Sequence, residues 1–176
     1  MTRPSRFVLF ASSLLMAAWA ATPTGGLAAA APAVADRAQA ESLKLNTIFD
    51  EYFEAYLQQN PILATSIGDP RYNDRFVVGI RPAAIAAEEK LHRDYLARLQ
   101  TVDRAVLPTA DQLSYDIFKT GREREIEGFK FPDELIPLNQ FYSTPNSFAQ
   151  LGSGNGLQPF KTVQDYDNFL QRLDGF

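Results

Sequence analysis

The chain has 176 residues, of which 45% are hydrophobic and 22% are charged, and its formal net charge is −4 at pH 7. This composition is typical of a globular protein, and the excess of acidic residues argues against a nucleic-acid-binding protein, which needs a basic surface for phosphates. The absence of cysteine excludes disulfides and thiolate sites, and a single histidine, His92, excludes a histidine-rich zinc site built by this chain alone.

The N-terminal residues have the pattern of a secretory signal peptide. Two arginines precede an uncharged apolar run at residues 7–21, and small-residue cleavage patterns follow it, the last at Ala33-Val34-Ala35. This arrangement predicts a leader at residues 1–35 that is removed before Asp36. A membrane anchor is the alternative, but the run is shorter than the ~20 residues that a spanning helix needs. We therefore expect an exported protein, periplasmic or secreted, with no membrane contact in its mature part, residues 36–176.

The mature chain is predicted to begin with two helices separated by a proline. Residues 38–59 carry apolar side chains at three- and four-residue steps with polar residues between them, which is typical of an amphipathic helix. Pro61 cannot continue that helix, so Asn60 is predicted to cap a short second helix that ends at Gly68. Residues 69–76 are rich in turn formers and are predicted to be an ordered loop.

Two longer helices are predicted next. Pro82 begins a helix that runs to about residue 102 or 106, with an inner face formed by Ile85, Tyr95, Leu96, Leu99 and Val102. Thr109 and Gln112 have the spacing of a capping box, which predicts another helix start. This helix is predicted to point three apolar residues inward and to end in a solvated, charged tail near Gly128. The three residues are Leu113, Ile117 and Phe118.

Residues 129–160 show no regular period and contain four prolines, so they are predicted to be a long irregular loop. Their aromatic residues favour a loop packed by its own side chains. A last helix is predicted from Thr162, with Asp165 as its capping partner, and it carries Tyr166, Phe169, Leu170 and Leu173. The predicted fold is mainly α, with about four helices plus the long loop.

One polar set invites a functional interpretation: Asp69, Arg71, Asp74 and Arg75. An arginine can bind a substrate carboxylate through two parallel hydrogen bonds. Alternatively, Asp69 caps the loop while the arginines neutralise nearby acids. The structural role is favoured here.

The other polar candidates also have simpler structural interpretations. His92 lies on or beside an inner helix face, which favours a core or interface histidine over a catalytic one. The glycines of residues 152–156 lack the preceding strand that a phosphate-binding loop needs, and we interpret them as a plain loop. The acidic pairs Asp50/Glu54 and Glu123/Glu127 are interpreted as solvated helix faces. We therefore assign no catalytic, cofactor-binding or metal-binding residue.

Two stretches carry a family resemblance. Residues 51–76, EYFEAYLQQNPILATSIGDPRYNDRF, and residues 162–176, TVQDYDNFLQRLDGF, resemble the bacterial domain-of-unknown-function family 885. The first shares its Asn-Pro step, Ala-Thr pair and Gly-Asp-x-Arg-Tyr loop, and the second its Asp-Tyr…Arg-Leu helix. The resemblance implies a long α-helical domain similar to zinc metallopeptidases. Its suspected metal motif, His-Glu-x-x-x-Pro-Gly-His-His, is absent from this sequence, so no catalytic residue carries over.

The resemblance implies that residues 36–176 are an incomplete helical domain, the N-terminal section of an exported metal-dependent hydrolase. This section would form one wall of the substrate cleft, without enzymatic activity and without a cofactor of its own. Zinc is expected only in the full-length parent. The implied partners are the missing C-terminal part of the same domain and a peptide-like substrate. The alternative is a free-standing exported binding protein that uses residues 129–160 as its recognition surface.

Overall fold

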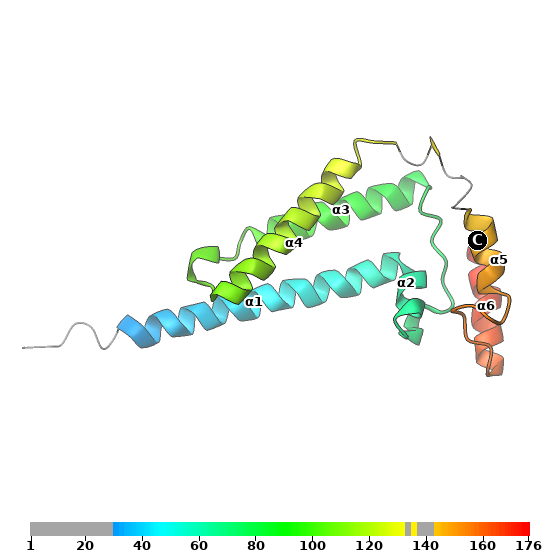
Figure 1. Cartoon of the computed structure of the whole chain (residues 1–176), viewed down its shortest axis with the longest axis horizontal. Coiled ribbons are helices and arrows are strands. Elements are labelled where there is room, and N and C mark those ends of the chain that lie inside the picture. Colours follow the sequence, from blue (N-terminus) through cyan, green and yellow to red (C-terminus); the bar gives the residue numbers. More distant parts are fainter. Residues whose placement is uncertain (1–29, 133–134, 137–142) are drawn as a thin grey trace, which may run out of the picture.

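The computed structural model describes residues 30–132, 135–136 and 143–176, and within them the chain is helical, without a β-strand. The prediction of a mainly α fold is confirmed. Figure 1 shows the α-helices and two short 3-10 turns, which are α1 (Ala30–Gln59), α2 (Pro61–Ser66), η1 (Pro70–Tyr72), α3 (Pro82–Leu99), η2 (Arg104–Val106), α4 (Thr109–Gly128), α5 (Thr144–Leu151) and α6 (Val163–Gly175).

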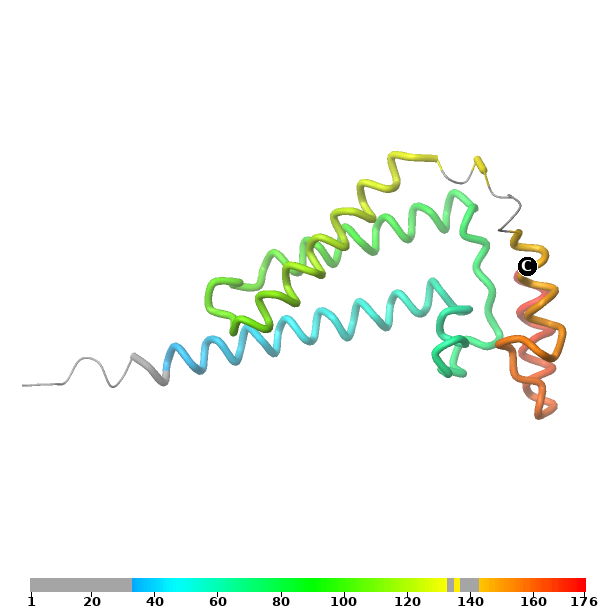
Figure 2. The backbone as a smooth tube through the Cα atoms, viewed as in Figure 1, coloured from blue at the N-terminus to red at the C-terminus, as the bar shows by residue number. Residues whose placement is uncertain are grey.

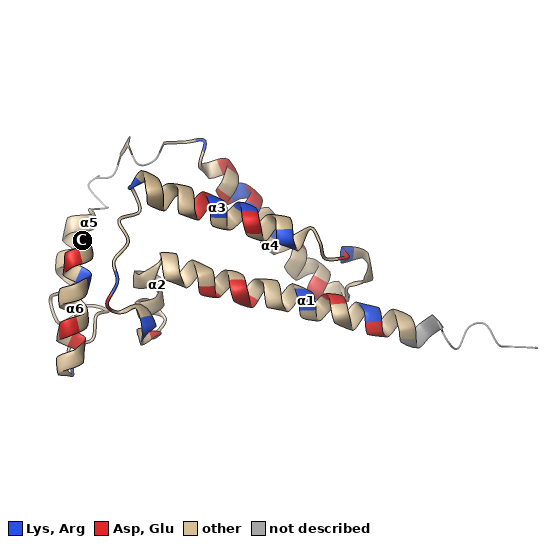
Figure 3. Ribbon diagram, turned by 180° about the vertical axis from the view of Figure 1, so that it is seen from behind, with Lys and Arg blue, Asp and Glu red and all other residues tan. Residues whose placement is uncertain are grey.

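The helices form two groups. The antiparallel pair α3 and α4 packs along α1, and α2 folds back at the C-terminal end of α1 (Figures 1 and 2). Helices α5 and α6 lie side by side beyond α2, where the rings of Phe148 and Phe169 are 5.7 Å apart. Figure 3 shows acidic and basic residues interspersed along α1 and α3. Among the described helices, none is long and apolar enough to cross a membrane.

The main core lies between α1, α3 and α4. Leu45 and Ile48 from α1 pack with Leu99 from α3 and Tyr115 from α4, and all four are buried. Each such side chain stabilises the fold by about 1.5–3 kcal/mol through burial of its apolar surface. This core fixes the position of α1, and α1 in turn binds the loop at residues 69–76.

A smaller core joins the end of α1 to α2 and η1. Pro61 occupies the first turn of α2, as predicted, and Gly68 ends the helix region with φ +86°, which favours glycine. Asn60 occupies the N-cap position of α2, as predicted, but its side chain makes no capping hydrogen bond. Its side-chain Nδ2 instead donates to the Tyr56 carbonyl of α1 at 2.9 Å.

The bounds of α1 and α3 differ from the predicted ones. Helix α1 begins at Ala30, before the predicted residue 38 and inside the predicted leader. The remainder of that leader, residues 1–29, lies outside the described residues, so the signal peptide stays a prediction. Helix α3 begins at Pro82 as predicted and ends at Leu99, and Val102 is buried in the turn that follows.

Helix α4 begins at the predicted residue, but the predicted capping box is absent. Thr109 begins the helix, but the capping position is Pro108 and no side chain caps the helix there. The amide of Gln112 donates to the Leu107 carbonyl at 2.9 Å, outside the helix. A capping box needs an extended hydroxyl residue before the first turn, and Pro108 occupies that place.

The predicted inner face of α4 is also partly wrong. Leu113 and Ile117 are 61% and 65% exposed, whereas Tyr115 is buried and Phe118 packs against the core. The ring of Phe118 lies 4.9 Å from that of Phe49 on α1. The helix can present one face to α1, and this aromatic contact selects the face that carries Tyr115 and Phe118. The charged end of α4 is helical through Gly128.

The predicted irregular segment 129–160 contains a helix, α5. Ser143 caps it by accepting from the Asn146 N–H, and Pro145 lies in its first turn, where proline is tolerated because no N–H is needed. Pro145 was predicted to interrupt regular structure, whereas it lies at the start of α5. In contrast, the capping box of α6 is confirmed, with Thr162 Oγ1 accepting from the Asp165 N–H at 3.2 Å.

Candidate functional site

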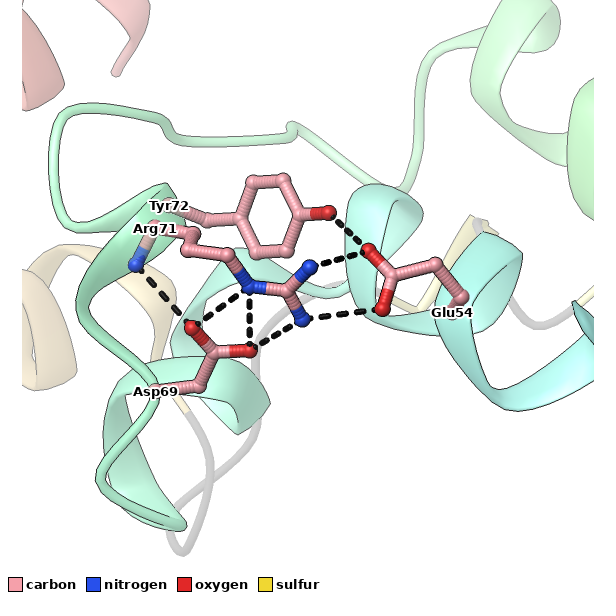
Figure 4. Close-up of polar contacts among 4 residues, drawn as sticks. All are labelled: Glu54, Asp69, Arg71 and Tyr72. Carbon is pink, nitrogen blue, oxygen red and sulfur yellow. Dashed lines mark hydrogen bonds and ion pairs between the residues drawn. The ribbon is translucent and has the colours of Figure 1, made fainter. Parts of the chain in front are cut away.

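The charged loop between α2 and α3 is anchored to α1 by Arg71 (Figure 4). Asp69 caps η1 by accepting from the Arg71 backbone N–H at 3.1 Å. The Arg71 guanidinium donates to both oxygens of Glu54, at 2.7 and 2.8 Å, and to Asp69 at 2.6 Å. The Tyr72 hydroxyl donates to the same Glu54 carboxylate at 2.5 Å. One guanidinium thus joins η1 to the middle of the C-terminal half of α1.

The electrostatics of this cluster leave little capacity for a ligand. The Arg71 hydrogen bonds lower the pKa of both Asp69 and Glu54, and the two carboxylates raise the pKa of Arg71. All three groups are therefore ionised at neutral pH. Since the arginine already binds two carboxylates, the structural interpretation is the better one for Asp69 and Arg71. Glu54, predicted as part of a solvated pair with Asp50, is in fact bound here, while Asp50 remains exposed.

Asp74 and Arg75 adjoin this cluster on the same loop. Their side chains are 3.8 Å apart, and the Arg75 guanidinium lies 5.3 Å from the centroid of the Tyr72 ring, as does the Arg71 guanidinium. The four predicted residues are thus brought together, but through the ring of Tyr72 and the carboxylate of Glu54, neither of which was predicted to take part. The backbone carbonyl of Arg75 also belongs to a second site.

That second site is centred on Arg172 from α6, which was not predicted to be a site residue. Its side chain is fully buried. The guanidinium donates to the backbone carbonyls of Tyr72 and Arg75, at 2.7 and 2.8 Å, and to Thr65 Oγ1 at 2.9 Å. It also donates to the Gln158 side-chain oxygen. These bonds join α6 to α2, to the charged loop and to the segment before α6, and we refer to them as the Arg172 hub.

Burial lowers the pKa of Arg172 to about 10, and the Asp74 carboxylate acts in the opposite direction. The guanidinium is therefore charged at neutral pH. No carboxylate lies within ion-pair distance of it among the residues that the structure describes, so neutral oxygens satisfy its donors. Arginine suits this place because its planar fork reaches several carbonyls at once.

An apolar cavity of about 440 Å³ lies beside the hub, between α2, α5 and the loop that follows α5. The described residues that line it are uncharged. They are Ile62, Phe76, Thr144, Ser147, Phe148, Gln150, Leu151, Asn155, Gly156 and Leu157. Phe148 packs on Phe76 and Phe176, with ring centroids 5.1 and 4.3 Å away, so rigid aromatic contacts support one wall.

Comparison with known families identifies residues 61–176, which contain the charged loop and the Arg172 hub. A family model described as a bacterial protein of unknown function (DUF885) matches residues 61–176. The chain belongs to this family. No curated protein and no solved structure matches the chain. The resemblance to this family is thereby confirmed for residues 61–76 and 162–176, and the matched segment includes the charged loop, the Arg172 hub and the apolar cavity of this DUF885 chain.

His92 of the DUF885 chain is a core residue, as predicted. It is 1% exposed and lies between the rings of Tyr52 and Phe129, with centroids 6.1 and 6.0 Å away. Burial lowers its pKa, and the carboxylates of Glu88 and Glu125 act against that effect. The imidazole is therefore neutral at pH 7.

The glycines of residues 152–156 form the turn after α5, with φ +79° at Gly154. A Cβ at Gly156 would lie 2.7 Å from the Gln150 carbonyl oxygen, so close packing accounts for that glycine. The remaining predicted pair also has ordinary roles. Glu123 and Glu127 are exposed and form ion pairs with Lys119 and Lys130.

Proposed function

We propose that this DUF885 chain is the helical wall of a substrate cleft in an exported protein that resembles zinc-dependent peptidases, and that it binds substrate without supplying catalytic groups. The observation that carries the proposal is the apolar cavity beside the Arg172 hub. Export rests on the leader pattern of residues 1–35, and the peptidase-like context rests on the sequence resemblance.

The cavity supports a substrate class. Its volume of about 440 Å³ falls within the range of about 300–1,000 Å³ that is usual for small-molecule sites. Its walls are apolar and aromatic, and Thr144, Ser147, Gln150 and Asn155 supply neutral hydrogen-bonding groups. Such a lining fits an uncharged apolar side chain and the peptide amide beside it, because a charged group would have no partner there.

An exposed apolar face on α6 supports a covering partner. Val163, Tyr166, Leu170 and Leu173 recur at three- and four-residue steps and are 79%, 55%, 57% and 47% exposed. A helix that exposes such a stripe usually packs it against further protein. In this proposal the partner is the C-terminal part of the same domain, which would bring the suspected zinc site to the cleft.

The cavity is tested with a neutral aromatic probe, N-acetyl-phenylalanine amide, titrated into the full chain and followed by saturation-transfer NMR. We expect saturable binding that Ser147→Phe weakens at least about tenfold, a change of about 1.4 kcal/mol, because the new ring fills the cavity. Ala149→Phe is the matched control, since Ala149 is exposed on α5 and does not line the cavity. Binding that is absent, or lost equally in both variants, would contradict the proposal.

Export is tested by placing residues 1–35 in front of a phosphatase that folds only outside the cytoplasm. We expect phosphatase activity in the periplasm and removal of the leader before the residue that corresponds to Asp36. Activity confined to the cytoplasm would remove the exported part of the proposal. An uncleaved, membrane-bound fusion would instead favour the anchor.

The alternative, a free-standing exported binding protein, draws on the same cavity but needs no covering partner. The two differ in the behaviour of the chain in isolation. A free-standing binding protein binds little hydrophobic dye, whereas a section that lacks its partner binds the dye at the exposed faces of α4 and α6.

A further inference from the structure

A smaller pocket, of about 250 Å³, adjoins the apolar cavity beside the Arg172 hub. It is lined by Asp69 and Asn73 from the charged loop and by Leu157 and Pro159 from the segment before α6, and we refer to it as the Asn73 pocket. Leu157 is 55% exposed and lines both the pocket and the apolar cavity. A ligand in the apolar cavity can therefore continue into the Asn73 pocket across one leucine side chain.

Asn73 supplies a side-chain amide to this pocket. The residue is 5% exposed, and its Oδ1 accepts from the Thr65 hydroxyl at 2.8 Å. Its Nδ2 donates to no group within the residues that the structure describes. Unlike Nε2 of Gln158, which also has no partner there and is inaccessible, Nδ2 of Asn73 keeps exposed surface. A nearly buried amide thus has an unused donor in a place where a ligand can supply the acceptor.

Recognition of a ligand holds for either orientation of the Asn73 amide. The Thr65 hydroxyl has one hydrogen, and its oxygen lies 3.0 Å from the Pro61 carbonyl as well as 2.8 Å from Asn73 Oδ1. If that hydrogen is donated to Pro61, Asn73 turns its nitrogen to Thr65 and leaves its oxygen as an acceptor for the pocket. A peptide group carries both an N–H and a carbonyl oxygen, so it satisfies whichever atom of the amide faces the pocket.

The charges around the pocket favour a neutral ligand group. Among the described residues that line it, the charged one is Asp69. Its carboxylate accepts from the Arg71 backbone N–H at 3.1 Å and from the Arg71 guanidinium at 2.6 Å, so its charge is balanced within the protein. A ligand carboxylate would be repelled by Asp69, because Arg71 is already bound by Asp69 and Glu54. An uncharged peptide group avoids this repulsion.

The Arg172 hub holds the two sides of the Asn73 pocket together. Arg172 donates to Thr65, which contacts Asn73 on one side, and to Gln158, which lies between Leu157 and Pro159 on the other. The pocket is therefore formed before a ligand arrives, which lowers the entropy cost of binding.

An extended peptide has the reach to occupy the cavity and the pocket together. An extended chain advances about 3.3 Å per residue, so two residues cover about 6–7 Å. A residue whose side chain fills the apolar cavity can thus place a peptide group, one or two residues along the chain, beyond Leu157.

We propose that the Asn73 pocket is a second subsite, which binds a peptide group of a ligand whose apolar side chain lies in the apolar cavity. The ligand class is then a neutral peptide segment of at least two residues and not a single amino-acid derivative. This inference rests on the proposed function, because it needs the apolar cavity to bind the side chain.

The test compares a short and a long neutral ligand in the full chain by saturation-transfer NMR. The short ligand is N-acetyl-phenylalanine amide, and the long one is N-acetyl-alanyl-phenylalanyl-alanine amide, which adds one residue on each side. We expect the long ligand to bind about three- to tenfold more tightly, the gain that one further neutral hydrogen bond supplies.

The variant Asn73→Ala removes the side-chain amide and is expected to abolish this gain. Thr65 keeps its hydrogen bonds to Pro61 and Arg172 in the variant. Affinity for the short ligand is expected to stay within about twofold, because Asn73 does not line the apolar cavity. The short ligand therefore also reports whether the variant is folded.

The variant Pro159→Phe fills the pocket from the other segment that lines it, and it is also expected to abolish the gain. Lys161→Phe is the matched control, since Lys161 is exposed and lines neither the pocket nor the apolar cavity. If Asn73→Ala binds neither ligand, the comparison of Pro159→Phe with Lys161→Phe decides.

The outcomes separate this inference from the proposed function. Absence of binding by both ligands contradicts the two together. Binding of the short ligand without a gain for the long one overturns the second subsite alone. The second subsite is also overturned if the gain persists in Asn73→Ala or Pro159→Phe, or if Lys161→Phe loses as much of it as Pro159→Phe.

Discussion

Replacing Arg172 with alanine is expected to lower the free energy of unfolding of the full chain by about 3–5 kcal/mol. The substitution removes the Arg172 hub, leaves the Thr65 hydroxyl and the Gln158 amide oxygen buried without this donor, and takes one hydrogen bond from each of the Tyr72 and Arg75 carbonyls. Each buried group that loses its partner costs about 1–3 kcal/mol. Urea denaturation followed by circular dichroism at 222 nm measures the loss.

Two companion variants separate the hub from a general effect of losing an arginine. Arg93→Ala removes an exposed arginine whose partner is Glu89, and a change of no more than about 0.5 kcal/mol is expected. Arg172→Lys keeps the charge but cannot reach the carbonyls with a planar fork, so it is expected to fall between the two. If Arg172→Ala were no more destabilising than Arg93→Ala, the hub would not hold α6 in place.

Acidification is expected to destabilise the chain through His92. Because burial favours the neutral imidazole in the folded state, its folded pKa lies below that of the unfolded chain, and the unfolded state takes up the proton first as the pH falls. Stability is therefore complete above about pH 6.5 and falls below it. The loss reaches at most about 1.4 kcal/mol at pH 5.5, and it levels off once the folded histidine is protonated.

The variant His92→Phe isolates this contribution, since a phenyl ring fits between Tyr52 and Phe129 and does not titrate. The measurement is the free energy of unfolding from urea curves at pH 7.5 and 5.5. The variant is expected to lose less stability than the wild type over this window. Glu88, Glu125 and Tyr56 surround the ring in both proteins, so their effects cancel in the comparison. An equal loss in both proteins would assign the acid sensitivity to other groups.

Local signals in the sequence predicted most helix starts. Pro61 and Pro82 lie in first turns, and Thr162 with Asp165 forms the predicted capping box, because each depends on residues within one turn. Helix α5 was missed for a local reason too, since Pro145 was interpreted as a break. Proline therefore marks both the end of α1 and the start of α5. At α5 the signal for a helix start is the capping residue Ser143.

The contacts that build the sites depend on tertiary structure and were not predictable in this way. Arg172 meets the carbonyls of Tyr72 and Arg75 across about 100 residues of sequence. Glu54 was interpreted as solvated because its i,i+4 neighbour is acidic, yet η1 brings Arg71 onto it. The one sequence signal that included Arg172 was the Asp-Tyr…Arg-Leu motif of the family resemblance. That motif predicted a helix and not a buried charge.

We propose that this DUF885 chain contributes a substrate-binding wall and not a catalyst. The most direct test is elemental analysis of the purified full chain after dialysis against zinc, together with a peptide-cleavage assay on the same sample. The chain has one histidine and no cysteine, and no cluster of three metal-ligating groups lies within the residues that the structure describes. We therefore expect substoichiometric zinc and no cleavage. One zinc ion per chain with peptide cleavage would contradict it.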